Sequence, residues 1–535
     1  MKVKNFFMMA VIGLMAVVSL SSCDDILGEW DRPAGSGAVA PQNPQTTTTI
    51  TLNLDGNLFN NDKLYLLSGD AAINIATITE GAPVTITSSD ENVITIDADG
   101  NVVPVGPGTA TITIKVIESE KYTGATETIT IVVGRKVSLA DETGSEFVAQ
   151  NGDQITGIAP NTMHLTIPDG ALVRLKDATI KPTTGTATAA VVCAGDATLI
   201  LEGTNVVHGM NNKAGIQVGP EGKTLAIDGT ESIEAQSNNG DGAGIGSNAD
   251  ESCGNIVISN GKIIAYANNG TGMWANRGSA IGSGKNGSCQ NIEIRGGTVN
   301  ARAVMGCAIG SGRGIGDDSS ASCQDILISG GIVTAETVIA NDISDPGAAI
   351  GSAQNGTCGN ITITDGTVTA ISTMEAGERY CGAAGIGSGF GKSTCGNILI
   401  TGGTIDSKCS NNGTGHSVGM YLYYGGAGIG TGDGGGNSWI TKCGTITITG
   451  GNVKATGGLY SAGIGLGKAG LGMLVCGNIS ITGGIVNAVG GTSADAIGKG
   501  KETYCTIGTV TVDPSVTWNG TKGYTATATG YKRIL

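Results

Sequence analysis

The sequence predicts an all-β protein in which a small β-sandwich precedes a long parallel β-helix, or solenoid. Three observations predict this class. One unit of about 35 residues recurs through the second half of the chain. Glycine makes up 91 of the 535 residues, whereas aromatic residues make up only 4%. Apolar and polar residues alternate with a period of two in short runs separated by turn residues, which is typical of half-buried strands.

Composition and charge exclude several classes of protein. The 40% share of hydrophobic residues argues against disorder, and only 12 prolines without a Gly-X-Y period argue against collagen. The 30 basic and 45 acidic residues give a formal charge of −15. An acidic chain lacks the positive surface that binds phosphate backbones, so we expect no nucleic-acid partner.

The first 22 residues read as a secretory signal peptide. Lys2 and Lys4 precede an apolar run at 6–20, which is too short for a comfortable membrane span and is followed by LSSC at 20–23. This tetrapeptide resembles a bacterial lipobox, which implies cleavage before Cys23 and attachment of a membrane-anchoring lipid to its sulfur. The two aspartates that follow resemble the surface-export signal of Bacteroidetes lipoproteins. That resemblance implies an outer-membrane protein facing the cell exterior.

A flexible tether and a small β domain follow the signal. Residues 23–46 contain the lipidated cysteine and then Gly, Pro, Ser and Gln without periodicity, which indicates a tether. Residues 47–135 alternate with period two and contain turn signals such as Asp99-Gly100. The stretch TSSDENVITIDADGNVVPVGPGTATITI (87–114) resembles the bacterial Ig-like group 2 family, although a Trp common in that family is absent near Ile86. The resemblance implies a sandwich that acts as a spacer or adhesion module.

The repeat array covers residues 137–535 and ends in a capping segment. Its core reads CGNIVISNGKIIA at 253–265 and recurs six more times, as far as CGNISITGGIVNA at 476–488. The first isoleucine of the unit recurs every 33 to 37 residues, with one step of 48. A second motif of the type AIGSG lies between the cores. Each Ile-x-Ile pair exposes one apolar face that only a stacked neighbour can bury, which predicts a parallel β-helix.

The whole array resembles the right-handed parallel β-helix repeat regions of predicted bacterial surface proteins. Most such regions have no defined activity. The resemblance therefore implies fold and location more than function.

Seven cysteines stand three residues before the first isoleucine of a unit, and Ile507 takes that place in the last coil. The replacement by isoleucine predicts a small apolar interior column of buried thiols. Disulfides and a metal ladder are the alternatives, but side chains that point the same way from adjacent parallel strands suit a disulfide poorly. The seven are Cys253, Cys289, Cys323, Cys358, Cys395, Cys443 and Cys476.

No catalytic residue, metal ligand or cofactor is expected. Asp317 and Asp318 resemble one element of the polygalacturonases, but the companion motifs of that family are missing. Aromatic residues are instead concentrated in the insertion that makes the 48-residue step. Exposed rings stack on sugar rings, so we interpret these residues as candidate ligand contacts; the alternative is that they cover the loop's own small core. The candidates are Trp274, Tyr421, Tyr423, Tyr424 and Trp439.

The leading hypothesis is a non-catalytic protein anchored through Cys23 to the outer membrane. It would act in adhesion or carbohydrate binding through the β-helix, with a polysaccharide, a host-surface glycan or a protein as partner. One alternative is a β-helix polysaccharide lyase or glycoside hydrolase. The other is a purely structural surface component.

Overall fold

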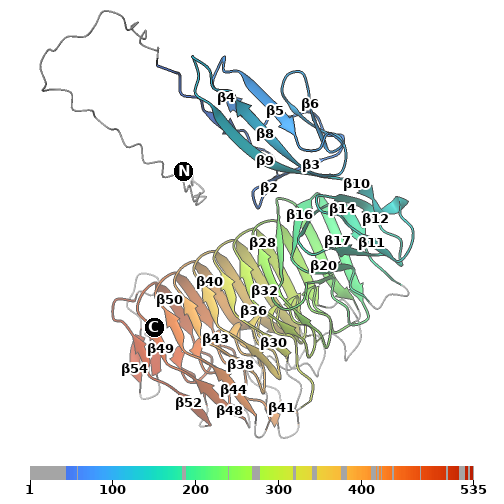
Figure 1. Cartoon of the computed structure of the whole chain (residues 1–535). Coiled ribbons are helices and arrows are strands. Elements are labelled where there is room, and N and C mark those ends of the chain that lie inside the picture. Colours follow the sequence, from blue (N-terminus) through green and yellow to red (C-terminus); the bar gives the residue numbers. More distant parts are fainter. Residues whose placement is uncertain are drawn as a thin grey trace, which may run out of the picture.

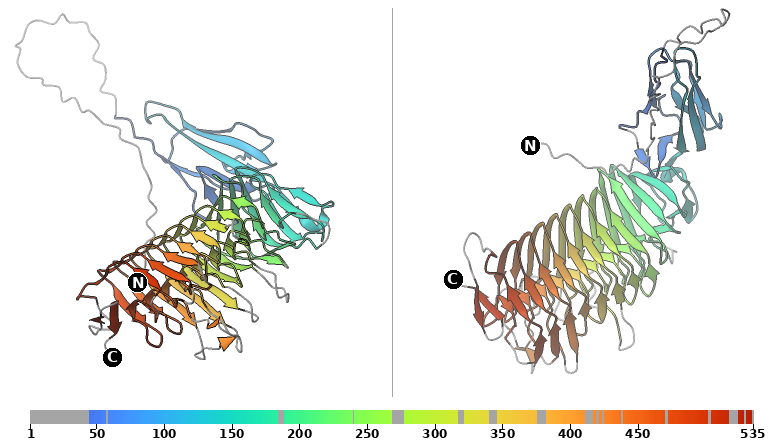
Figure 2. Two further views of the ribbon diagram at one scale, coloured as in Figure 1. Left: turned by 90° about the horizontal axis from the view of Figure 1, so that it is seen from below. Right: turned by 60° about the vertical axis from the view of Figure 1, so that its left-hand side comes forward.

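The fold comes from a computed structural model that describes residues 44–535 apart from a set of short gaps. Figure 1 shows a small β unit at one end of a long stack of coils, and Figure 2 shows the same stack from two further directions. The gaps are residues 57, 184–187, 239, 268–276, 317–320, 340–345, 375–381, 411–416, 419–420, 423–424, 437–438, 470–471, 502–503, 517–523, 528–529 and 534–535. Cys23 and the rest of the predicted signal and tether before residue 44 lie outside the described residues.

The small β unit contains one five-stranded sheet and two strand pairs, β1–β4 and β6–β7. The five-stranded sheet has the order β2-β3-β9-β8-β5, in which only the β3–β9 pair is parallel. Leu64, Ile112 and Ile131 lie at the centre of its own buried core. The strands are β1 (Ile50–Leu52), β2 (Leu58–Asn60), β3 (Lys63–Leu67), β4 (Ala76–Ile78), β5 (Val84–Ser88), β6 (Ile94–Ile96), β7 (Val102–Pro104), β8 (Gly108–Val116) and β9 (Ala125–Gly134).

The rest of the chain winds through three long sheets, and nearly all of their strands pair in parallel with the next coil. The large sheet receives two strands from most coils. It contains β10 (Lys136–Ser138), β12 (Gln154–Ile158), β14 (Ala171–Ile180), β16 (Ala197–Glu202), β17 (Thr204–Met210), β19 (Thr224–Gly229), β20 (Ser232–Asn238), β23 (Asn255–Ile258), β24 (Lys262–Ala267), β27 (Ile292–Ile294), β28 (Thr298–Ala303), β31 (Ile326–Ile328), β32 (Ile332–Ile339), β35 (Ile361–Ile363), β36 (Thr367–Met374), β39 (Ile398–Ile400), β40 (Thr404–Ser410), β45 (Ile446–Ile448), β46 (Asn452–Thr456), β49 (Ile479–Ile481), β50 (Ile485–Val489) and β53 (Val510–Val512).

The other two sheets carry the AIGSG and cysteine motifs, and we call them the Ile-Gly sheet and the Cys sheet. The Ile-Gly sheet contains β11 (Glu146–Val148), β13 (His164–Ile167), β15 (Val191–Cys193), β18 (Ile216–Gln217), β21 (Ile245–Gly246), β25 (Ile281–Gly282), β29 (Ile309–Gly310), β33 (Ile350–Gly351), β37 (Ile386–Gly387), β43 (Ile429–Gly430), β47 (Ile464–Gly465), β51 (Ile497–Gly498), β54 (Tyr524–Thr527) and β55 (Gly530–Arg533). The Cys sheet contains β22 (Ser252–Cys253), β26 (Ser288–Cys289), β30 (Ala321–Cys323), β34 (Gly356–Cys358), β38 (Thr394–Cys395), β44 (Ile440–Cys443), β48 (Met473–Cys476) and β52 (Cys505–Ile507). The short 3-10 helix η1 (Leu139–Asp141) precedes β11.

The repeat isoleucines form continuous interior columns, as the sequence predicts. Ile256 pairs in register with Ile292, and Ile292 pairs with Ile326. All three side chains are fully buried in one core that extends from Val137 to Val516. Because full burial of such a side chain contributes about 1.5 to 3 kcal/mol, these columns supply a large part of the force that stacks the coils. The parallel β-helix region is thereby established.

The cysteine column is also confirmed. Cys253 pairs with Cys289, and each of the other five column cysteines pairs with its neighbour in the next coil. All seven are buried thiols without a disulfide. The Sγ atom of Cys289 points to the carbonyl oxygen of Gly254 at 3.6 Å. The contact with the sulfur of Cys253, together with burial, raises the pKa of the Cys289 thiol well above its usual range.

In the coils from β21 onward, a glycine at the corner permits the close approach of successive turns. Gly351 has a φ of +140°, and a Cβ atom placed on it would lie 1.8 Å from the carbonyl oxygen of Gly387 in the next coil. No side chain fits at that distance. The glycine of the AIGSG motif is therefore required by backbone packing between coils.

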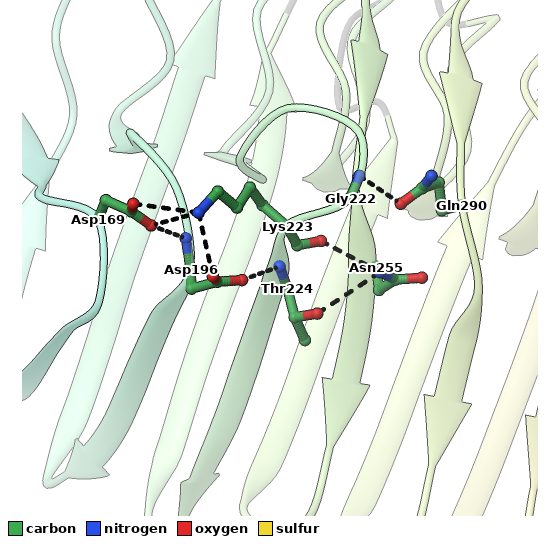
Figure 3. A network of polar contacts seen from close by, with 7 residues as sticks. All are labelled: Asp169, Asp196, Gly222, Lys223, Thr224, Asn255 and Gln290. Atoms are coloured by element: carbon green, nitrogen blue, oxygen red, sulfur yellow. Dashed lines mark hydrogen bonds and ion pairs between the residues drawn. The ribbon is translucent and has the colours of Figure 1, made fainter.

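A polar column, which we call the corner ladder, runs along one edge of the stack. In its first coils, Asp169 accepts a hydrogen bond from the backbone N–H of Asp196, and Asp196 accepts one from Thr224, each at 2.8 Å (Figure 3). Lys223 bridges both carboxylates at 3.0 and 3.2 Å, and this contact holds the pKa of Asp169 below its usual range. Further along, side-chain oxygens repeat the pattern at Asn255, Asn291, Asp325, Asn360 and Asn397.

The small β unit packs directly on the first coils of the stack. Tyr65 and Val132 of the unit form a buried apolar cluster with Leu172 and Ile200 of the coils. The guanidinium Nη2 of Arg174 donates a hydrogen bond of 2.7 Å to the backbone carbonyl oxygen of Tyr65. The two parts therefore share a buried interface with both apolar and polar contacts.

Candidate ligand-binding surface

The structure describes the side chain of one of the five predicted aromatic contacts. Trp274, Tyr423 and Tyr424 lie outside the described residues. Tyr421 begins the short strand β42 (Tyr421–Leu422), which pairs antiparallel with β41 (Ser417–Val418). Trp439 stands directly before β44, at the end of the long insertion.

Trp439 is half-buried and packs against residues of the preceding coil as well as its own loop. Its ring meets the ring of Phe390 edge-on, with centroids 6.1 Å apart and an interplanar angle of 85°. The ring also lies so close to Gly391 and Gly435 that a Cβ atom on either glycine would come within 3 Å of it. These contacts favour the interpretation that Trp439 covers a small loop core, with only part of its ring available to a ligand.

Three exposed apolar side chains lie beside Trp439 on the outer face of the Cys sheet. Ile440 pairs with Met473, and Leu474, the residue after Met473, pairs with Cys505, which places Tyr504 next in the same row. Their side chains are 39%, 42% and 70% exposed, respectively. We call Ile440, Met473 and Tyr504 the apolar row.

Strand alternation explains why these side chains face outward. In β44 and β48, Thr441, Leu474 and the column cysteines point into the core. Ile440 and Met473 directly precede Thr441 and Leu474, so they point outward. A second outward row runs parallel to the first and pairs Lys442 with Val475 and Val475 with Thr506. An apolar surface is thus bordered by an ammonium group and a hydroxyl that can donate hydrogen bonds.

Sequence reasoning located the insertion but missed all three residues of the apolar row. The available signal was the apolar character of positions 440 and 473, where alternation requires solvent-facing residues. Tyr504 gave a weaker signal because the cysteine of the last coil is displaced from its usual position relative to Ile507.

Asp241 and Glu251, two carboxylates in the middle of the stack, form ion pairs with basic side chains. Asp241 contacts Arg277 at 3.2 Å and Lys285 at 3.6 Å. Glu251 contacts Lys213 at 2.8 Å; burial raises the pKa of Glu251, but hydrogen bonds from Lys213 and Asn248 outweigh this effect and hold it below its usual value. These contacts give both carboxylates a structural role between coils.

Two further absences apply to the described part of the chain. It contains no cluster of three or more His, Cys, Asp or Glu side chains that could hold a metal ion. It also contains no helix with the length and hydropathy that a membrane crossing requires. Asp317 and Asp318 lie outside the described residues.

Comparisons with known proteins agree with the observed coils. A family model described as a beta helix repeat matches residues 292–313, 326–354, 361–390 and 446–468. Each matched segment begins at the first isoleucine of a repeat unit. Together with the three parallel sheets, the matches define the class of this chain's second part as a parallel β-helix repeat region. Comparisons with curated proteins and with solved structures gave no significant match.

Proposed function

We propose that the protein is anchored by lipid at Cys23 to the outer membrane, faces the cell exterior, and binds polysaccharide through the apolar row without catalysis. The observation that carries the proposal is that Ile440, Met473 and Tyr504 form one in-register row of exposed apolar side chains on three successive coils. Isolated exposed apolar residues are normal on proteins, whereas a contiguous row indicates a binding surface.

The spacing of the row suits a sugar polymer. Successive coils are about 4.8 Å apart, which is close to the length of one pyranose unit in an extended chain. A polysaccharide that lies along the stack would therefore place one sugar ring over each side chain of the row. The exposed ring of Tyr504 offers a face for stacking, while Lys442 and Thr506 offer donors for sugar hydroxyls.

The N-terminal parts take supporting roles in this proposal. The LSSC tetrapeptide supports a lipid anchor at Cys23. Cloud-point detergent extraction tests it: the wild type should partition into the detergent phase and a Cys23→Ser variant into the aqueous phase. The motif at 87–114 supports an Ig-like sandwich in the small β unit. Its direct packing on the first coils fits a spacer that holds the β-helix away from the membrane.

Affinity electrophoresis of the full-length protein in detergent, against plant and host polysaccharides, tests the binding function. Retardation by a polysaccharide is expected for the wild type and is expected to be lost in Tyr504→Ala and Met473→Ser. Ile332→Thr is the matched control: Ile332 is 55% exposed on the large sheet, in one outward column with Thr298 and Thr367, away from the row. It should remain retarded.

Each mixture is also assayed for new reducing or unsaturated chain ends. Intact polymer is expected. New chain ends would overturn the non-catalytic proposal in favour of a lyase or hydrolase. Absence of retardation by every polysaccharide would contradict glycan binding and favour a protein-directed adhesin or a structural component.

A further inference from the structure

The outward row of the Cys sheet that carries Lys442 continues into the earlier coils. Lys442 pairs in register with Thr394 of the preceding coil, and Thr394 pairs with Thr357. Each earlier coil of the Cys sheet places a hydroxyl-bearing side chain at this position, directly before the column cysteine. We call these residues the hydroxyl row: Ser252, Ser288, Ser322, Thr357 and Thr394.

The hydroxyl row faces outward along the lower side of the stack in Figure 1, where the Cys sheet runs from β30 to β52. Each of its residues stands beside a buried cysteine, so strand alternation turns its side chain away from the core. Ser252 and Thr357 are exposed, and the other three residues are half-buried. Ser288 donates a hydrogen bond of 2.7 Å to the hydroxyl of Ser252. Within the described residues, the hydroxyls of Ser322, Thr357 and Thr394 have no hydrogen-bond partner.

Other outward positions of the repeat change their chemistry from coil to coil. In the large sheet, one outward column pairs Val257 with Glu293 and Glu293 with Leu327. Interior positions keep one residue type because the core must stay closely packed, but an outward side chain has no such constraint. A hydroxyl group that recurs in every earlier coil of the Cys sheet therefore indicates a role at the surface.

We propose that the hydroxyl row and the apolar row form one continuous track, which binds a long, unbranched polysaccharide lying extended along the stack. The Cys sheet has eight strands in successive coils. At about 4.8 Å per coil it spans about 34 Å, which fits about eight sugar units. The Ser and Thr hydroxyls exchange hydrogen bonds with the edge of the sugar chain, and the ring of Tyr504 contacts a sugar face at the C-terminal end. The inference rests on the proposed function and deepens it, since it defines the length and shape of the ligand.

A pair of substitutions in the middle of the hydroxyl row tests the track. Thr357→Val/Thr394→Val removes two hydroxyls but keeps β-branched side chains that suit a strand. Its affinity for the polysaccharide should fall at least about fivefold, the effect of two lost hydrogen bonds. Thr367→Val/Thr404→Val is the matched control, because these two exposed threonines pair with each other in the same two coils but on the large sheet. The control should bind like the wild type.

The length of the ligand gives a readout that a merely structural effect would not produce. The polysaccharide that retards the wild type in affinity electrophoresis is partially hydrolysed, and fragments of about three and about eight units are compared as competitors of that retardation. For the wild type and the control, the longer fragment should compete at least about fivefold better. In Thr357→Val/Thr394→Val this advantage should largely disappear.

Each outcome decides between the track and the proposed function. Equal competition by the two fragments, or wild-type affinity in Thr357→Val/Thr394→Val, would overturn the continuous track and leave binding through Tyr504 intact. An equal loss of affinity in the control would overturn it too, because the large sheet would then contribute as much as the hydroxyl row. Absence of retardation of the wild type by every polysaccharide would remove the proposed function together with this inference.

Discussion

The substitution Gly351→Ala should destabilise the β-helix far more than an ordinary glycine substitution. The new Cβ atom would lie 1.8 Å from the carbonyl oxygen of Gly387, although real Cβ contacts are essentially never shorter than 3.0 Å. The two coils must therefore separate by about 1.2 Å at this corner, the difference between these distances.

The magnitude follows from the contacts that this separation breaks. Two backbone hydrogen bonds of 3.0 Å flank the corner, from Ile350 to Gly385 and from Ser352 to Gly387. Each contributes about 1 kcal/mol, and a side chain at positive φ costs about 1 to 2 kcal/mol. The free energy of unfolding should therefore fall by about 3 to 4 kcal/mol.

Urea unfolding followed by far-UV circular dichroism measures this difference. The control is Gly222→Ala, because Gly222 also has a positive φ of +83° but has no atom within 4 Å of the added Cβ. The control should lose only the conformational part, about 1 to 2 kcal/mol. Equal losses in the two variants would refute the argument that backbone contact between coils requires the motif glycine.

Three further outcomes are expected. Arg174→Met should lower the stability of the contact between the small β unit and the first coils by about 1 to 3 kcal/mol, measured as faster proteolysis of the unit, because the Tyr65 carbonyl loses its donor. A thiol reagent should leave the seven column cysteines unmodified in the native protein and label all seven in concentrated guanidinium, since they are buried. Burial lowers the pKa of His208, so the native state binds the imidazole proton less tightly than the unfolded state does. The free energy of unfolding should therefore fall as pH drops below about 6.5, and urea unfolding should show a smaller fall in His208→Gln.

The β-helix could be predicted because the spacing of the repeat determines the register in which its strands pair. A one-residue shift would expose both isoleucines of an Ile-x-Ile pair, so the spacing of Ile256 and Ile292 alone determines which strands pair. The cysteine column follows from the same register. The Ig-like sandwich, the lipid anchor and the surface location stay predictions.

The candidate surfaces could not be read in the same way. The Arg174–Tyr65 contact joins residues 109 positions apart in segments that share no repeat. The Trp439 ring packs against Phe390 and Gly391 of the preceding coil, a contact that strand alternation does not encode. Both depend on side-chain packing between segments, whereas the repeat pattern specifies only the backbone register.

The joint between the small β unit and the coils has a mechanical consequence. Strand β9 ends at Gly134 and β10 begins at Lys136, so Arg135 alone connects them, and its Nε atom is held 3.0 Å from Asp153 of the first coils. A connection of one pinned residue beside a buried interface cannot act as a hinge. A pulling force applied to the small β unit would therefore be transmitted to the first coils through β9 and the Arg174 contact, without relative rotation of the two parts.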